Sequence, residues 1–174
     1  MGLSKGYVQI YTGDGKGKTT ASLGLALRAA GAGLKVYIGQ FLKSGDYSEI
    51  QALKALGDRV TVVQFGSGKL IRGQPDDADR TLAAQGLAEA RQALTAGQYD
   101  LVILDEANVA AAMGLVSFEE LIGLVKEKPD AAELVLTGRG ASPELMAVAD
   151  LVTEMRAVRH YYAAGVHARR GIEK

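Results

Sequence analysis

The sequence predicts a three-layer α/β fold, in which helices cover both faces of a mainly parallel sheet of about six strands. Short apolar or β-branched runs alternate with helical patterns along the chain, an order typical of successive βαβ units. These runs are apolar enough to be covered on both faces. The 174 residues contain no linker, repeat or low-complexity tract, so we expect one domain over residues 1–174.

The elements follow one another in a regular order. Strands are predicted at 7–12, 35–41, 60–65, 100–105, 133–138 and 151–156. Helices are predicted between them, at 18–33, 47–57, 76–97, 117–128 and 142–150. Ser117 with Glu120 forms a capping-box pattern, and Ser142 precedes a proline at a first helical position. Residues 157–174 follow neither periodicity and are expected to form an irregular C-terminal tail.

The composition excludes several classes of function. Twenty basic residues balance twenty acidic ones, so no net field favours nucleic acid or anionic lipid as a partner. The absence of cysteine excludes disulfides, thiolate metal sites and a cysteine nucleophile, and it favours a cytoplasmic location. No signal peptide and no apolar run of roughly 18 residues is present, so no membrane partner is expected.

The segment TGDGKGKTT, residues 12–20, joins the first predicted strand to the first predicted helix. It has the pattern of a Walker A loop, although its first glycine stands one position later than usual. Gly13, Gly15 and Gly17 adopt positive φ at low cost, so successive amides converge on a phosphate at a helix N-terminus. Lys18 would reach the phosphates and the Thr19 hydroxyl would bind Mg²⁺. The alternative is a glycine-rich turn that binds nothing.

Asp14 is unusual within such a loop, because a carboxylate beside a triphosphate is repelled. It must turn outward, pair with Lys16, or contact the ribose or the metal. The sequence leaves these possibilities open, and we count Asp14 among the candidate nucleotide-binding residues.

Polar residues end three other predicted strands at the edge where α/β sheets bind ligands. Asp105 and Glu106 follow an apolar strand, as in the second half of a P-loop site, and would hold Mg²⁺ or orient a reactant. With the Walker A loop, they indicate a P-loop NTPase-like fold of the RecA-like kind. Arg139 in TGRG and Lys43 in QFLK would reach phosphates or an acidic substrate group. The alternative for each of these side chains is solvation at a strand end.

The chain resembles the ATP-dependent corrinoid adenosyltransferases of the P-loop type. The carriers of the resemblance are the motifs at residues 11–36, 40–43, 99–108, 134–140, 144–156 and 159–173. They run in order across nearly the whole chain. The most specific combination is TGDGKGKTT with TGRG, ADLVTEM and the tail motif HYYAAGVHARRGI.

The resemblance implies transfer rather than hydrolysis. In that family the Co(I) of a reduced corrinoid attacks the 5′ carbon of ATP and expels triphosphate, in cobalamin biosynthesis or salvage. It implies that Thr19 and Glu106 contribute to an Mg²⁺ site that Asp105 supports, that Lys18 assists the chemistry, and that the enzyme is a homodimer with a possible electron-donating flavoprotein. By the same resemblance, the phosphates are held by Gly15, Lys16, Gly17, Lys18, Thr19 and Thr20.

One stretch departs from the family pattern. Family members often carry an aromatic pair after the third strand that displaces the lower ligand of the corrinoid, whereas here Lys69 and Ile71 stand there and Phe65 is four residues upstream. Either another apolar group fills that space, or the corrinoid activity is weak, altered or absent. This departure supports the alternative of an ATP-binding regulatory protein without turnover. The other alternative is a P-loop kinase or NTPase.

Overall fold

The computed structural model describes residues 2–69, 71 and 73–173, and it confirms the predicted α/β fold. Six strands pair in the order β3-β2-β4-β5-β1-β6, and each pairing is parallel. β5 lies between β1, which leads into the glycine-rich loop, and β4, which ends in Asp105. The strands are β1 (Val8–Thr12), β2 (Val36–Phe41), β3 (Val60–Phe65), β4 (Leu101–Asp105), β5 (Glu133–Thr137) and β6 (Leu151–Glu154).

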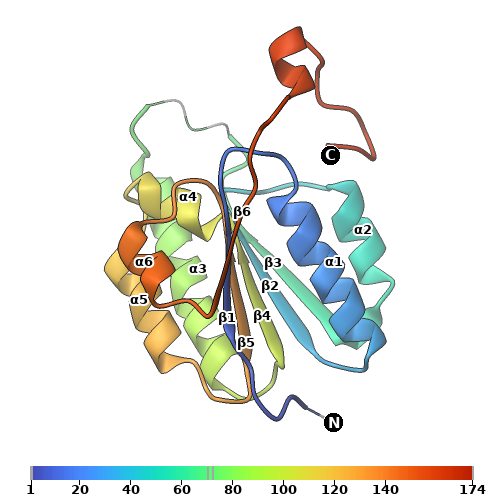
Figure 1. The fold of residues 1–174 in the computed structure, drawn as a ribbon, viewed down its shortest axis with the longest axis vertical. Coiled ribbons are helices and arrows are strands. Elements are labelled where there is room, and N and C mark those ends of the chain that lie inside the picture. The colour runs from blue at the N-terminus through green and yellow to red at the C-terminus, as the bar shows by residue number, and fades with distance from the viewer. Residues whose placement is uncertain (1, 70, 72, 174) are drawn as a thin grey trace.

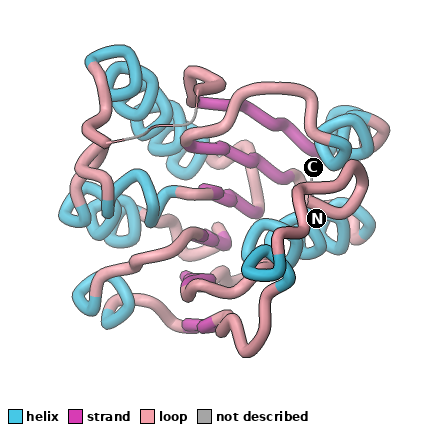
Figure 2. The backbone as a smooth tube through the Cα atoms, turned by 90° about the horizontal axis from the view of Figure 1, so that it is seen from above, coloured by secondary structure: helices cyan, strands magenta, loops and turns pink. Residues whose placement is uncertain are grey.

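Helices cover both faces of the sheet (Figures 1 and 2). α1 (Lys18–Gly31) and α2 (Ser48–Lys54) lie on one face. The other face carries α3 (Asp77–Thr95), α4 (Ala107–Ala112), α5 (Phe118–Glu127) and α6 (Pro143–Ala147). Two short 3₁₀ helices, η1 (Gly57–Arg59) and η2 (Tyr161–Ala164), complete the list.

The two faces have separate apolar cores because side chains alternate along each strand. On β4, Val102 and Leu104 pack with the α3–α6 layer, and Leu101 and Ile103 pack with α1 and α2. All four side chains are buried. The nearly continuous apolar pattern of the central strands is therefore the signature of this two-sided burial.

The predicted helix ends are largely confirmed. The Glu120 N–H donates to Ser117 Oγ at 3.1 Å, and the Ser117 N–H donates to the Glu120 carboxylate at 2.7 Å. Ser142 Oγ accepts a bond from the Leu145 N–H at 3.2 Å. The short α4 was not predicted, because it follows β4 directly without a sequence signal for a helix start.

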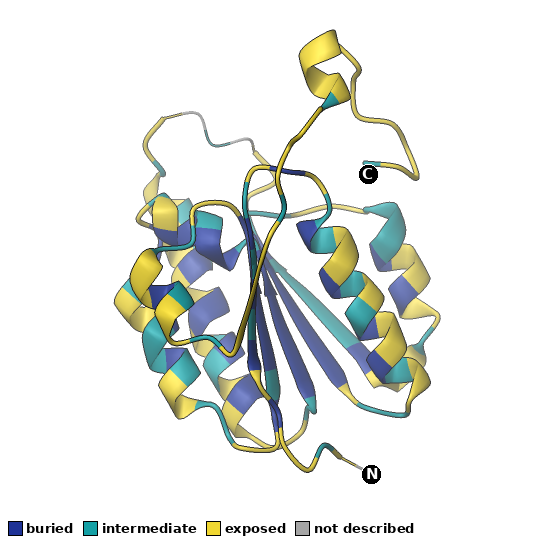
Figure 3. Cartoon of the chain, viewed as in Figure 1, coloured by how far each residue is buried: buried dark blue, intermediate teal, exposed yellow. Residues whose placement is uncertain are grey.

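β6 differs from the other strands, since all four of its residues are exposed. It lies at the edge of the sheet beside β1. The segment that follows is almost entirely exposed, yet it turns back above the sheet (Figure 3). Arg169 donates to Glu173 at 3.1 Å and Tyr161 also bonds Glu173.

No helix in the described part of the chain has the length and apolar character to cross a membrane.

Candidate functional site

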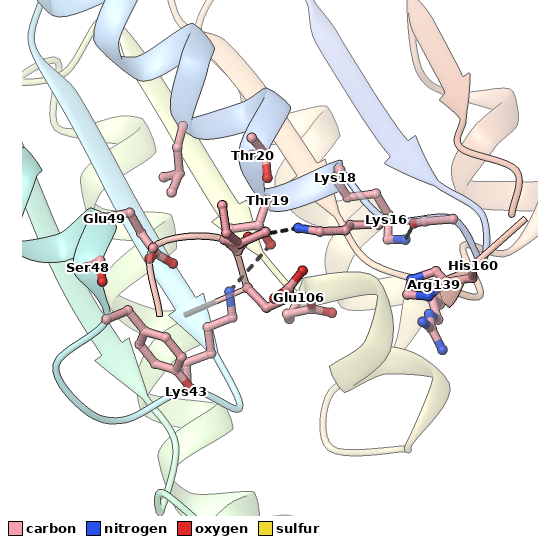
Figure 4. Close-up of a pocket in the computed structure, with 17 residues that line it drawn as sticks. Lys16, Lys18, Thr19, Thr20, Lys43, Ser48, Glu49, Glu106, Arg139 and His160 are labelled. Carbon is pink, nitrogen blue, oxygen red and sulfur yellow. Dashed lines mark hydrogen bonds between the residues drawn. The ribbon is translucent and has the colours of Figure 1, made fainter. Parts of the chain in front are cut away.

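A cavity of about 680 Å³ opens at the carboxyl edge of the sheet (Figure 4). Its walls come from the glycine-rich loop, the loop after β2, the ends of β4 and β5, and the C-terminal tail. The predicted site residues that line it are Gly15, Lys16, Gly17, Lys18, Thr19, Thr20, Glu106 and Arg139. Lys43 and the tail residues His160, Gly171, Ile172 and Glu173 line it as well. Gly13, Asp14 and Asp105 are not among the lining residues.

The glycine-rich loop needs glycine for two reasons. Gly13 and Gly17 have φ values of 91° and 123°, which are strained for other residues. Gly13 and Gly15 also contact the backbone after β6, where the Gly15 N–H donates to the Met155 carbonyl at 2.6 Å. A Cβ on Gly15 would lie 2.7 Å from that oxygen. The segment after β6 therefore supports the loop from outside.

Lys18 lies inside the loop rather than in solvent. Its side chain is buried, and its ammonium donates to the carbonyl oxygens of Gly13 at 2.6 Å and Gly15 at 2.8 Å. Burial lowers the pKa of Lys18, and the charge of Arg139 lowers it further. Because α1 begins here without a side-chain cap among the described residues, its first amides add a positive end of a helix dipole to the same place.

The carboxylate of Asp105 is completely buried and accepts four hydrogen bonds. Oδ1 accepts from the hydroxyls of Thr19 at 2.9 Å and Thr137 at 2.7 Å. Oδ2 accepts from the Gln40 amide at 3.1 Å and the Lys43 ammonium at 2.7 Å. A carboxylate has about four acceptor positions, so these partners use its whole capacity. Asp105 therefore acts on the cavity through Thr19 and Lys43.

Glu106 reaches the cavity from an unusual backbone conformation. Its φ of 60° and ψ of 16° lie in the left-handed region, and its N–H donates to Thr137 Oγ1 at 3.1 Å. Burial raises the pKa of Glu106, as does the neighbouring Asp105, whereas Lys43, Lys18 and Arg139 oppose the shift. Figure 4 shows Glu106 between the side chains of Lys43 and Arg139. The carboxylate is therefore placed among cations at an energetic cost.

The substitution Glu106→Gln is expected to stabilise the protein at neutral pH. Because the pKa of Glu106 is raised in the folded state, the folded protein binds this proton more tightly than the unfolded chain does. The free energy of unfolding therefore falls as the pH rises from the ordinary glutamate range through the raised pKa. Glutamine does not ionise, so Glu106→Gln removes this loss of unfolding free energy. Urea unfolding without divalent cations should show a gain near pH 7.5 that vanishes below about pH 4.

The exposed Glu119 on α5 provides the control for that measurement, since Glu119→Gln removes the same charge far from the cavity. It should give no gain at neutral pH. A Glu106→Gln protein that is less stable than the wild type at neutral pH, or whose gain is independent of pH, would contradict the argument.

Three further predicted residues, Asp14, Lys16 and Arg139, lie in the glycine-rich loop and after β5. Asp14 is exposed, which fits the outward orientation among its possibilities, while the Lys16 ammonium donates to the Ile172 carbonyl at 3.0 Å. Arg139 follows Gly138, whose carbonyl accepts a bond from the Asn108 amide at 3.2 Å.

Sequence reasoning missed Gln40, Gln64, Thr137 and Met155. Their only signal was their position at strand ends.

The departure after β3 has a structural counterpart. Ile71 is partly buried and packs against the core of the α3–α6 face, and Lys69 is exposed. Phe65 is also buried in the core, and its ring centroid lies 6.0 Å from that of Phe41. Phe65 is therefore no substitute for the missing aromatic pair, and residues 70 and 72 of this stretch lie outside the described residues.

A glycine-rich loop around a buried lysine, next to a strand-end aspartate bonded to the threonine after that lysine, defines a P-loop protein. The family model for ATP:corrinoid adenosyltransferase BtuR/CobO/CobP matches residues 4–173. The chain therefore belongs to the ATP:corrinoid adenosyltransferase family, as the sequence motifs predicted. ATP and a corrinoid are the substrates that this family implies.

Individual relatives agree with the family match. A corrinoid adenosyltransferase of Escherichia coli is 34% identical over 170 residues, which are 97% of this chain and 86% of the relative. One from Pseudomonas aeruginosa is 32% identical over 170 residues, with 97% and 84% coverage. An uncharacterized Nostoc protein is 37% identical over 169 residues, 89% of this chain, and the match spans only 45% of that protein's length.

Proposed function

We propose that this protein transfers the 5′-deoxyadenosyl group of ATP to the Co(I) of a reduced corrinoid and releases triphosphate, in cobalamin biosynthesis or salvage. The observation that carries the proposal is the cavity itself, where four cationic side chains from three segments meet a glycine-rich loop. They are Lys16, Lys18, Lys43 and Arg139. A polyphosphate is the ligand that such a cavity suits.

The proposed chemistry asks for no nucleophile from the protein. The electron pair of Co(I) forms the Co–C bond to the 5′ carbon, and the C–O bond breaks with its pair leaving on the triphosphate. The reduced corrinoid supplies the nucleophile, so the protein has to align the reactants and stabilise the departing charge. Lys18 and the loop amides would stabilise that charge. The phosphates would be held along residues 13–20.

The donor atoms in the cavity fit Mg²⁺. The Thr19 hydroxyl donates its proton to Asp105 and accepts a long bond from the Lys43 ammonium at 3.4 Å, which leaves one oxygen lone pair for an ion. The carboxylate of Glu106 lines the same cavity. Mg²⁺ prefers such oxygens and is usually completed by phosphates and water. Among the described residues no group of three His, Cys, Asp or Glu forms a metal cage, which fits an ion held largely by the nucleotide. Bound there, it would neutralise charge on the triphosphate.

The proposal is tested by incubating the protein with ATP, Mg²⁺ and chemically reduced cobalamin and then analysing the products. Tripolyphosphate and a photolabile Co–C species in equal amounts are the expected result. ADP would instead indicate a kinase or NTPase. Unchanged ATP with measurable ATP binding would indicate a regulatory protein, the alternative that the core-packed Ile71 and Phe65 favour. A homodimer, a flavoprotein donor and a cytoplasmic location remain predictions.

A further inference from the structure

Polar side chains from four neighbouring strands form a row at the carboxyl edge of the sheet. The row consists of Gln64 on β3, Gln40 on β2, Asp105 on β4 and Thr137 on β5. Gln40 is the register partner of Gln64 on one side and of Asp105 on the other. This polar row crosses the sheet from its β3 edge to the cavity, and Gln40 and Asp105 within it are completely buried.

The hydrogen bonds of the polar row have a fixed direction. An ionised carboxylate only accepts, so Gln40 must turn its NH₂ group to Asp105, at 3.1 Å. The Gln40 oxygen then faces β3 and accepts a bond from the Gln64 NH₂ group at 3.0 Å. The Gln64 oxygen is left to accept, and it accepts the Gly45 N–H at 3.0 Å. Each amide is therefore oriented by its neighbour, starting from the buried charge.

The far end of this chain of bonds is the loop that carries Lys43. The loop leaves β2 at Leu42, whose φ is 62° and whose N–H donates to the Phe65 carbonyl at 3.0 Å. Gly45 is held by Gln64 and has a φ of 128°, a conformation that favours glycine. Lys43 lies between these two anchored residues and reaches back to Asp105. Gln64 therefore acts on Asp105 from one side and on the Lys43 loop from the other.

We propose that Gln64 is a positioning residue of the nucleotide site, which orients Asp105 through Gln40 and anchors the Lys43 loop through Gly45. The proposal rests on the proposed function, because Thr19 and Lys43 are the groups that Asp105 presents to the nucleotide. Gln64 touches no ligand in this account. It acts on Asp105 along the polar row, through the amide groups of both glutamines, and on the Lys43 loop through the bond to Gly45.

The test compares Gln64→Glu with Gln64→Leu by calorimetric titration with ATP and by thermal unfolding. Glutamate has the same shape as glutamine but no N–H group to donate to the Gln40 oxygen. The Gln40 amide is therefore expected to flip, so that its NH₂ group faces residue 64 and its oxygen faces Asp105. We expect Gln64→Glu to weaken ATP binding roughly tenfold and Gln64→Leu less, since removal of a hydrogen bond to a charged network has this size. Gln85 on α3 is exposed, and its amide donates to the Glu89 carboxylate on the same helix at 2.9 Å. Gln85→Leu should therefore bind ATP normally.

A double substitution separates positioning from general stability. Because Gln64→Glu keeps an acceptor for the Gly45 N–H and affects Asp105 only through Gln40, Gln40→Met combined with Gln64→Glu should bind ATP no more weakly than Gln40→Met alone. Amide exchange of residues 42–47 should be faster in Gln64→Leu, which removes the acceptor of the Gly45 N–H, and unchanged in Gln64→Glu and Gln40→Met, which both keep an oxygen there. Additive losses in the double variant, or wild-type ATP affinity in Gln64→Glu, would overturn the proposal.

These readouts need no corrinoid. A wild-type protein that binds ATP but forms no Co–C bond contradicts the proposed function, and the titrations still decide the role of Gln64.

Discussion

Lys18→Ala is expected to weaken ATP binding by roughly a hundredfold, near 3 kcal/mol, and to abolish adenosyl transfer. The ammonium of Lys18 lies within the glycine-rich loop, on the carbonyls of Gly13 and Gly15, at the wall of the cavity. Alanine removes its charge from the place where the leaving triphosphate gathers negative charge. Titration with ATP and the Co–C assay both measure the loss.

The matched control is Lys54→Ala, because the Lys54 side chain lies on α2 and is 64% exposed. It should leave ATP binding and turnover unchanged. Thermal unfolding of Lys18→Ala checks that the loop variant is folded. Near-normal turnover in a folded Lys18→Ala protein would contradict the placement of the triphosphate in this loop.

Asp105→Asn is expected to lower the free energy of unfolding by about 3 kcal/mol, because it breaks a buried ion pair. Asparagine keeps one acceptor oxygen and places an NH₂ group against donors from two neighbouring side chains. At least one buried donor among Thr19, Thr137 and Gln40 then loses its partner, and Lys43 loses its counter-ion. Urea unfolding measures the change, and ATP affinity should fall with it.

Asp58→Asn is the control for the buried aspartate, since Asp58 is an exposed residue of η1. We expect its effect to stay within about 0.5 kcal/mol, as for most surface substitutions. An Asp105→Asn protein as stable as the wild type would mean that the four hydrogen bonds contribute little to the fold.

The sequence predicted the order and type of the main elements because burial on two faces leaves a strong apolar pattern in β2, β4 and β5. It did not predict α4, whose six residues are too few for a helical period and lack a capping side chain. It also treated β6 as another covered strand. β6 lies at an edge of the sheet, and which strand takes that place depends on the strand order, which is invisible in a local pattern.

The sequence predicted those parts of the candidate site that consist of contiguous residues. The glycine-rich loop and the Asp105–Glu106 pair are local motifs, and the structure brings them to one edge. Gln40, Gln64 and Thr137 were missed because each looks like an ordinary strand end on its own. Their meaning comes from register, which aligns them across β3, β2, β4 and β5.

The bond between the Gly15 amide and the Met155 carbonyl has a consequence for biosynthesis. During translation the phosphate loop leaves the ribosome long before the strand that braces it, so the nascent chain has the loop without its final support. Nucleotide affinity should therefore arise abruptly, when β6 docks beside β1, rather than grow with chain length.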